Sequence, residues 1–305
     1  MKIAIASHVV LDTIRDTKGL ITNSLGGPAC YCGLTARQFG FKVILATKVG
    51  TDFPQENKII LHNNGIVIEK YQIVESPTTR FQLVVNNECR ELFLYSKCSP
   101  LTVEEIRKVQ TDCWLISPVI DEVPFDVLTA IVNDRGDRNF VMLDPQGYTR
   151  RICSSGQISL LDNLTIDLSG ITAIKADRGE LGVLTGGLEG LAGMQFLHSV
   201  KGIEFVILTE NRIIHFLHNE MHYWINLKNI DTSDSTGVGD ILSSAFCCAC
   251  IKEKDPLWAI CFGAGAVRAA LETKSTGLNK IPSKSKIEES ASYYYNTIEF
   301  KSTVI

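Results

Sequence analysis

The sequence predicts a layered α/β fold, in which helices cover both faces of a mainly parallel sheet. Two observations lead to this prediction: short β-branched apolar runs recur along the chain, and helical patterns separate most of them. The 305 residues, 45% of them hydrophobic, are enough for one large core. We expect a single domain over residues 1–305, since no repeat, low-complexity tract or linker divides the sequence.

Six apolar runs have the length and composition of buried strands. They span residues 2–6, 43–49, 113–116, 139–143, 170–176 and 205–208. Polar residues follow three of these runs, at Asp144, Asp177 and Thr209. Open α/β sheets bind ligands at the carboxyl ends of their strands, so these residues are candidates for a ligand crevice. An ordinary strand-ending turn explains each of them equally well.

Helix signals fall between the predicted strands. Thr102 and Glu105 form a capping box, which predicts a helix over residues 103–110. The pair Asp255-Pro256 opens a second helix, which we expect to run to Leu271.

Two segments interrupt this alternation and predict a small second sheet. Residues 81–85 and 91–94 are strand-like and are joined by three polar residues, as in a β-hairpin. The segment 13–25 supplies a further strand. We expect a lid formed by about 13–25 and 78–96, which would exclude water from a pocket below it. A plain surface hairpin and a dimer edge remain alternatives.

Composition excludes several classes of partner. The net charge is −4 and the basic residues are scattered, which argues against binding to nucleic acid or to an anionic membrane surface. The apolar run at the N-terminus is too short for a signal peptide, and no stretch is long enough to span a membrane. We therefore expect a cytoplasmic protein.

The ten cysteines do not form a recognisable metal site. Only Cys247 and Cys250 stand as C-x-x-C, without a second pair or nearby histidines. Together with Cys248 they lie in an apolar run, where free cysteine packs as a small hydrophobe. We expect reduced thiols in the core.

The heptapeptide from Asp234 to Asp240, D-S-T-G-V-G-D, combines two glycines and a carboxylate before an apolar helical run over 241–251. Gly237 and Gly239 allow backbone N–H groups to approach an anion closely, and the start of a helix attracts phosphate. Asp240 is placed to accept a proton during phosphoryl transfer. A glycine turn before an acidic first helical turn is the structural alternative.

A second group of residues near the N-terminus suits a polyol. Asp12 follows the first strand, and Gly26-Gly27 precedes a helix that we expect to start near Ala29. A carboxylate can accept hydrogen bonds from two hydroxyls, and glycines permit close backbone approach. A turn cap is the alternative role for Asp12.

Four of these motifs, in this order, resemble the PfkB (ribokinase-like) carbohydrate kinase family. They are the diglycine at 26–27, K-V-G-T-D at 48–52, D-R-G-E at 177–180 and D-S-T-G-V-G-D at 234–240. The resemblance implies a ribokinase-like three-layer α/β/α sandwich with a small β-hairpin lid. It also implies an ATP- and Mg²⁺-dependent kinase that phosphorylates a hydroxyl of a small polyol.

The resemblance further implies a role for each matching residue. Asp240 would be the catalytic base, and the N–H groups of Gly237, Val238 and Gly239 would stabilise the transferring phosphoryl group. Glu180 would act on Mg²⁺ through water. The acceptor residues would be Asp12, Gly26, Gly27, Tyr31, Thr79 and Arg80, and the nucleotide residues Asp177, Thr209, Thr236 and Gly265. The segment 263–277 would border the adenine.

The chain also departs from the family pattern. Asp177 stands where asparagine is usual, and Val238 occupies the small middle position of the G-A-G-D turn. Tyr31 replaces an asparagine that binds sugar. A tyrosine offers a hydroxyl and an aromatic face, which suits a ring such as a sugar, a cyclitol like myo-inositol, or a nucleoside.

Competing classes fit less well. A dinucleotide oxidoreductase needs an early G-x-G-x-x-G, and a P-loop NTPase needs G-x-x-x-x-G-K-S or G-K-T; neither pattern occurs at the required place. Two alternatives within the family remain: a nucleoside kinase, and a non-catalytic protein that binds a nucleotide or metabolite. The protein is expected to be a monomer, or a homodimer formed through the lid.

Overall fold

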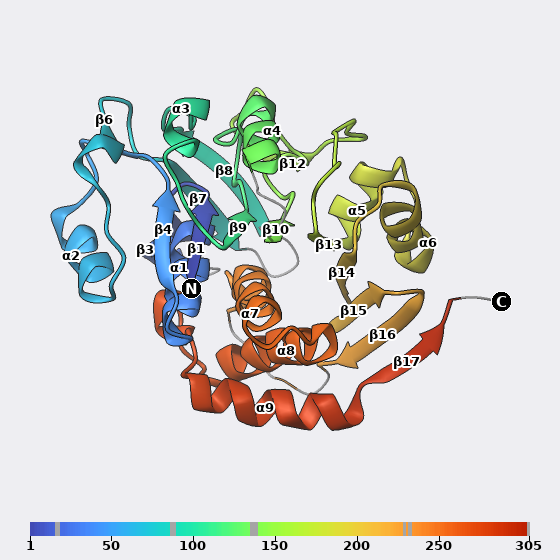
Figure 1. Cartoon of the computed structure of the whole chain (residues 1–305). Helices are drawn as coiled ribbons and strands as arrows, with labels where there is room; N and C mark the ends of the chain where they lie inside the picture. The colour runs from blue at the N-terminus through green and yellow to red at the C-terminus, as the bar shows by residue number, and fades with distance from the viewer. Residues whose placement is uncertain (16–18, 86–89, 135–139, 228–229, 231–233, 304–305) are drawn as a thin grey trace.

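The structure is a computed structural model that describes residues 1–15, 19–85, 90–134, 140–227, 230 and 234–303. Within these residues, a nine-stranded mixed sheet forms the centre, in the order β17-β16-β15-β14-β13-β10-β9-β1-β4 (Figure 1). Its strands from β4 to β14 run parallel, and those from β15 to β17 run antiparallel.

The parallel part contains all six strands expected from the sequence. They are β1 (Lys2–Ala6), β4 (Lys42–Ala46), β9 (Cys113–Ile116), β10 (Phe140–Leu143), β13 (Ala173–Asp177) and β14 (Phe205–Glu210). Some boundaries differ: the strand expected at 170–176 begins at Ala173, the one expected at 205–208 extends to Glu210, and residue 139 lies outside the described residues. The expected strand at 43–49 ends at Ala46. Its last residue instead belongs to a separate strand, β5 (Val49–Gly50), which pairs with β6 (Ile73–Val74).

The antiparallel part was not expected from the sequence. It consists of β15 (Ile213–His218), β16 (Met221–Asn226) and β17 (Glu299–Ser302). All four residues of β17 are exposed, so its sequence carries no hydrophobic signal. Its position is fixed by backbone pairing with β16, about 75 residues earlier in the chain.

Helices cover both faces of the sheet. One face carries α1 (Pro28–Gln38), α7 (Val238–Glu253), α8 (Pro256–Glu272) and α9 (Lys284–Thr297), and the other α3 (Val103–Ile106), α4 (Phe125–Asp134), α5 (Arg178–Thr185) and α6 (Gly190–Gln195). Strand β1 alternates between two cores: Ile3 and Ile5 pack with the first group, and Ala4 and Ala6 with the second. The predicted three-layer arrangement is therefore confirmed.

Some helices differ from their predicted length. The capping box at Thr102 and Glu105 is formed, but α3 ends at Ile106 rather than at residue 110. The remaining elements are α2 (Gln55–Asn63), β11 (Arg150–Ile152), β12 (Ile158–Leu160) and the short helices η1 (Lys70–Gln72), η2 (Phe196–Val200) and η3 (Gly277–Lys280).

A second sheet stands beside the main one. It has the order β3-β2-β7-β8 and is built from two hairpins, β2 (Val10–Arg15) with β3 (Ile21–Gly26) and β7 (Arg80–Val85) with β8 (Arg90–Ser96). Strands β2 and β7 join them in parallel. The predicted hairpin is present, although its turn at 86–88 lies outside the described residues. The first hairpin begins earlier than expected, so Asp12 lies within a strand.

The cysteines of α7 pack in the core as predicted. Cys247, Cys248 and Cys250 are buried free thiols. Helix α7 packs on α1, where the Ser244 hydroxyl donates a hydrogen bond of 2.7 Å to the Cys32 carbonyl oxygen.

In the described part of the chain, every helix is either too short or too polar to cross a membrane.

Candidate active site

The anion turn, residues 234–240, leads into the first turn of α7. Gly237 precedes the helix with φ of 78°, a left-handed conformation that glycine adopts without strain. A Cβ at Gly237 would lie 2.6 Å from the ring of Tyr31. Both the backbone conformation and the ring of Tyr31 therefore require glycine here.

The other two residues of the proposed anion hole, Val238 and Gly239, both have their N–H groups in the first turn of α7. The N–H of Val238 donates a long hydrogen bond of 3.4 Å to the Ser235 carbonyl oxygen. N–H groups in the first helical turn have no acceptor within the helix, and Gly239 lies in this turn. The turn thus presents helix N-terminal donors, to which an anion can bind.

Asp240 is buried at the third position of α7. Burial and the nearby carboxylate of Asp144 raise its pKa to about 7, while the cations of Lys175 and Arg150 oppose this shift. A carboxyl group with such a pKa exchanges its proton near neutral pH. This is the property required of a general base.

Lys175, on β13, was not predicted as a site residue. Its ammonium forms a buried ion pair of 2.9 Å with Asp144. A Cβ at Gly239 would lie 3.1 Å from its Nζ atom, so the ammonium is beside the anion turn. The sequence holds one signal: this lysine interrupts an apolar strand two residues before Asp177.

Asp177 and Glu180 form a reciprocal capping box at the start of α5. Asp177 Oδ1 accepts from the Glu180 N–H, and Glu180 Oε2 accepts from the Asp177 N–H, both at 2.8 Å. Glu180 is buried, and burial raises its pKa to about 7 against the effect of Lys175. Asp177 therefore caps the helix that positions Glu180.

The carboxylates near the anion turn fit a hydrated Mg²⁺ better than a directly bound ion. No group of three or more metal-ligating side chains occurs among the described residues. However, Asp144 Oδ1 is buried without a hydrogen-bond partner in the described part of the structure, and Glu180 interacts electrostatically with Asp144. Magnesium commonly retains several of its waters and contacts few carboxylates directly. The carboxylates of Asp144 and Glu180 could accept hydrogen bonds from these waters.

A cavity of about 340 Å³ adjoins the anion turn. Ser235, Val238 and Gly239 line one side of it, and Thr209 lies in its wall at the end of β14. The apolar residues of its lining are Ile213, Ile214, Leu227, Ile230, Leu242, Val267 and Leu271. The side chain of Val238, the unusual residue of the turn, belongs to this wall. Such a cavity suits a flat apolar ring joined to phosphates.

Gly265 does not border this cavity, contrary to the expectation for a nucleotide residue. A Cβ at Gly265 would lie 2.7 Å from the Ala291 nitrogen and 2.8 Å from the Ile287 carbonyl oxygen. The glycine therefore permits close packing of α8 on α9. Other residues of the expected 263–277 segment, Val267 and Leu271, reach the cavity instead.

The predicted acceptor residues Asp12, Gly26 and Tyr31 form a series of contacts that reaches the anion turn. A Cβ at Gly26 would lie 2.8 Å from Asp12 Oδ2 and 3.7 Å from the Tyr31 ring, which itself covers Gly237. Gly27, with φ of 80°, precedes α1. An unbroken line of contacts thus connects Asp12 with the start of α7.

Tyr31 is 2% exposed, so its ring serves first as packing between Gly26 and Gly237. Burial and the surrounding carboxylates raise the pKa of its hydroxyl, which stays protonated at neutral pH. Contact between Tyr31 and an acceptor remains a prediction.

Arg150 is a second residue that sequence reasoning missed. It donates hydrogen bonds to the Val119 carbonyl oxygen (2.9 Å) and to Gln146 Oε1 (2.8 Å). Burial raises the pKa of Asp12 to about 7, and Arg150 opposes this shift as it does for Asp240. The guanidinium therefore acts on both carboxylates. No local motif marks it, because tertiary folding alone brings β11 to the site.

Thr79, a predicted acceptor residue, does not line the cavity that Asp12 and Arg80 share. It is fully buried, and its hydroxyl contacts His8 Nδ1 at 2.8 Å and accepts a hydrogen bond from the Cys98 N–H at 3.0 Å. Its hydroxyl thus joins the segment after β1 to the segment after β8.

Arg80, the neighbouring residue, is more accessible. Its guanidinium pairs with Asp52 at 2.7 Å, and both residues are about 40% exposed. Arg80 and Asp12 line the same shallow cavity of about 230 Å³, together with Thr13 and Asn23. These polar groups agree with an acceptor that carries hydroxyls.

Comparison with known proteins connects this architecture with kinases. A pyrophosphate-dependent kinase in the ribokinase family, complexed with a pyrophosphate analogue and myo-inositol, has a TM-score of 0.79 at 20% identity, over 94% of this chain and 99% of that one. The ribokinase of Arabidopsis thaliana, complexed with ribose and ATP, has a TM-score of 0.70 at 14% identity, over 95% and 98%. The predicted ribokinase-like fold is confirmed.

A sequence comparison gives a further relative. A cytidine kinase of Thermococcus kodakarensis is 23% identical over 254 residues, which cover 81% of this chain and 87% of that protein. No family model matches the chain.

Proposed function

We propose that this protein is an ATP- and Mg²⁺-dependent kinase of the ribokinase-like family that phosphorylates a hydroxyl of a small polyol, a sugar or a cyclitol such as myo-inositol. The observation that carries the proposal is the position of Asp240. This buried carboxylate lies in the first turn of α7, at a helix start that can bind an anion, and the Tyr31 ring packed on Gly237 also reaches Gly26.

The reaction needs one proton acceptor and a set of donors for the phosphoryl group. As an acceptor hydroxyl attacks the γ-phosphorus of ATP, its proton passes to Asp240, the new O–P bond forms, and ADP leaves with the electrons of the broken bond. The N–H groups at the start of α7 and the ammonium of Lys175 stabilise the charge on the phosphoryl oxygens. Mg²⁺, when bound, would neutralise charge between the phosphates, and Glu180 and Asp144 would hold its waters.

Nucleotide is the favoured donor because of the apolar cavity beside the turn. Ile213, Leu227 and Val267 offer a surface that suits an adenine ring. Pyrophosphate has no such ring and would leave this surface unused. The similarity to a pyrophosphate-dependent kinase nevertheless makes pyrophosphate the donor to test against ATP.

The polar cavity at the lid favours a polyol acceptor. Asp12 and Asn23 can accept hydrogen bonds from hydroxyl groups, and Arg80 can donate. Similarity to an inositol-bound kinase agrees with a cyclitol.

A nucleoside is the second candidate acceptor. The relative named as a cytidine kinase supports it, and so does the aromatic ring of Tyr31 near Gly26. Acceptor assays can separate the two candidates.

ADP release with a panel of pentoses, hexoses, inositols and nucleosides tests the proposal. We expect one acceptor class to stimulate turnover, and Asp240→Asn to lower kcat by about 10²- to 10⁴-fold. Asp162→Asn, at a side chain that is 92% exposed, is the matched control and should keep the wild-type rate. Turnover that no acceptor stimulates, or an Asp240→Asn variant at full rate, would show that the proposal is wrong. Phosphorylation of an acceptor by pyrophosphate but not by ATP would overturn only the choice of donor.

A further inference from the structure

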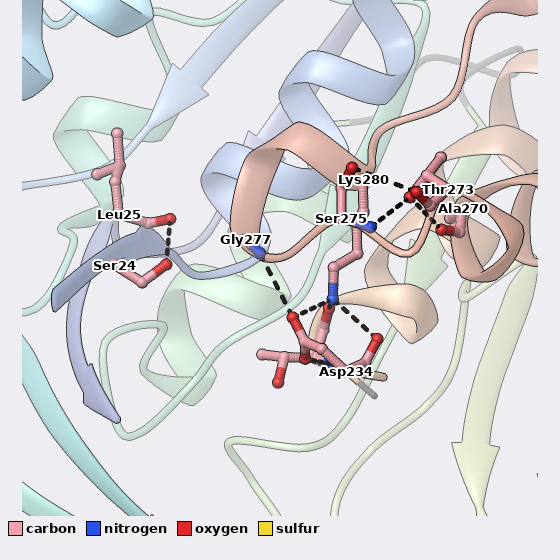
Figure 2. A network of polar contacts seen from close by, with 9 residues as sticks. Ser24, Leu25, Asp234, Ala270, Thr273, Ser275, Gly277 and Lys280 are labelled. Atoms are coloured by element: carbon pink, nitrogen blue, oxygen red, sulfur yellow. Dashed lines mark hydrogen bonds and ion pairs between the residues drawn. The ribbon is translucent and has the colours of Figure 1, made fainter. Parts of the chain in front are cut away.

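Lys280 is a fully buried lysine at the end of η3 whose ammonium is bound entirely within the protein. Its side chain is 1% exposed. The Nζ atom donates to Asp234 Oδ2 (2.7 Å), to the Asp234 carbonyl oxygen (3.2 Å) and to the Thr236 carbonyl oxygen (2.7 Å). Figure 2 shows the side chain running towards Asp234, with the dashed lines converging on its nitrogen.

Three acceptors of Lys280 in the described part of the chain belong to the anion turn. Asp234 Oδ1 also accepts from the Thr236 N–H at 2.8 Å, and Asp234 Oδ2 accepts from the Gly277 N–H at 3.4 Å. One ammonium and one carboxylate thus fix the backbone immediately before Gly237.

Burying an ammonium costs several kcal/mol, which a well-packed apolar side chain would avoid. Hydrogen bonds to three oxygens offset that cost, and they fix the positions of two carbonyl groups as well as a carboxylate. Burial opposes the ionisation of Asp234, yet the hydrogen bonds from Lys280 and Thr236 keep the pKa of this carboxyl below its usual value. The Asp234 carboxyl is therefore ionised at neutral pH.

The segment that carries Lys280 also contacts the second sheet, of order β3-β2-β7-β8. A Cβ at Gly277 would lie 3.2 Å from the Ser24 hydroxyl of β3. The same short helix therefore touches both the anion turn and the acceptor side.

We propose that Lys280 is a positioning residue for phosphoryl transfer: it acts as a built-in cation that holds residues 234–236, so that the N–H groups at the start of α7 point at the transferring phosphate. Lys280 does not touch the substrate. This inference rests on the proposed function, and its effect should fall on kcat rather than on acceptor binding, because the turn contacts the phosphoryl group and not the polyol.

Removal of Lys280 alone would leave Asp234 as a buried, poorly compensated charge and could unfold the chain. The informative variant is therefore Lys280→Met combined with Asp234→Asn, which removes both charges and keeps an acceptor for the Thr236 N–H. Lys284→Met is the matched control, since this lysine is 46% exposed and lies four residues away on α9.

For the double variant we expect an unfolding midpoint close to that of the wild type, kcat at least about tenfold lower, and an acceptor KM within about threefold of wild type. Inorganic pyrophosphate gives a second readout by calorimetry, because it reports on the phosphate site without a base or an acceptor. Its binding should weaken at least about fivefold. Lys284→Met should change neither kcat nor the affinity for pyrophosphate.

A folded double variant with wild-type kcat and wild-type pyrophosphate affinity would overturn the inference and leave the proposed kinase intact. The two failures can be distinguished. If no acceptor supports turnover in the wild type, but pyrophosphate binding still depends on Lys280, then the proposed function is wrong and the role of Lys280 in the anion site stands.

Discussion

Two buried lysines lie against the anion turn, and their surroundings differ. The ammonium of Lys280 donates hydrogen bonds to three oxygens, two of Asp234 and one of Thr236. Lys175 is also buried, but Asp144 is the one hydrogen-bond acceptor of its ammonium within the described residues. Its Nζ atom lies beside Gly239, at the start of α7.

The difference shows that burial and pairing alone do not define the role of a charged residue. An ammonium with three framework acceptors positions the backbone that it binds. An ammonium with fewer acceptors, next to helix N-terminal N–H groups, keeps donors for a ligand anion. We therefore assign Lys280 to the geometry of the turn and Lys175 to the charge of the phosphoryl group.

The largest effect is expected from the removal of the Lys175 charge. Lys175→Met combined with Asp144→Asn avoids leaving an unpaired buried carboxylate, so the variant should fold. We expect kcat to fall about 100-fold, since the variant loses both a charged donor to the phosphoryl group and a carboxylate proposed to hold the waters of Mg²⁺. Single-turnover kinetics would measure this. The variant Lys280→Met with Asp234→Asn neutralises its ion pair in the same way. If kcat fell no further in the Lys175 double variant than in this one, the distinction between the two lysines would be wrong.

The pH dependence of turnover gives a smaller effect with a defined sign. Asp240 must be ionised to accept a proton, so kcat/KM should rise with pH through the pKa of about 7 and level off above it. Arg150 favours the ionised form, and Arg150→Met should therefore move the midpoint upwards, by up to about one pH unit. Lys280→Met with Asp234→Asn should leave the midpoint in place. A profile that is flat between pH 6 and 8 would contradict the role of Asp240 as base.

The smallest effect is expected at the exposed pair Arg80–Asp52, which gives a reference for the buried pairs. Burial opposes ionisation of Asp52, but hydrogen bonds from Arg80 and Thr78 lower its pKa to about 2. The resulting stability is present above pH 4 and is lost as the pH falls towards 2. Asp52→Asn should lower the free energy of unfolding at pH 7 by less than about 1 kcal/mol, measured by urea denaturation. A loss of about 3 kcal/mol, the size expected when a buried ion pair is broken, would show that this exposed pair stabilises the protein as much as a buried one.

The sequence predicted the parallel half of the sheet and the anion turn well, for a physical reason. Buried strands such as β9 are continuous apolar runs, and a glycine before a helix has a local conformational cause, as at Gly237. The edge strand β17 could not be predicted, because its residues are exposed and its pairing with β16 is long-range.

The same distinction applies to the candidate site. Asp240 and Glu180 belong to local motifs. The structure places Asp240 in the first turn of α7, and Glu180 interacts with the Lys175–Asp144 ion pair. Gly265 and Thr79 were assigned through the resemblance, but the structure turns them towards α9 and towards His8. A motif fixes a residue's place along the chain, whereas packing decides the direction in which its side chain or Cα faces.

By itself, the sequence determined the fold class, the position of the anion turn and the candidate base, because helix starts, glycine turns and apolar periodicity act over a few residues. Only the tertiary structure decided which charges surround Asp240. Lys175, Arg150 and Asp144 come from three separate segments, and no local pattern marks their convergence. Charge interactions depend on distance in space and on burial, and both are properties of the folded chain.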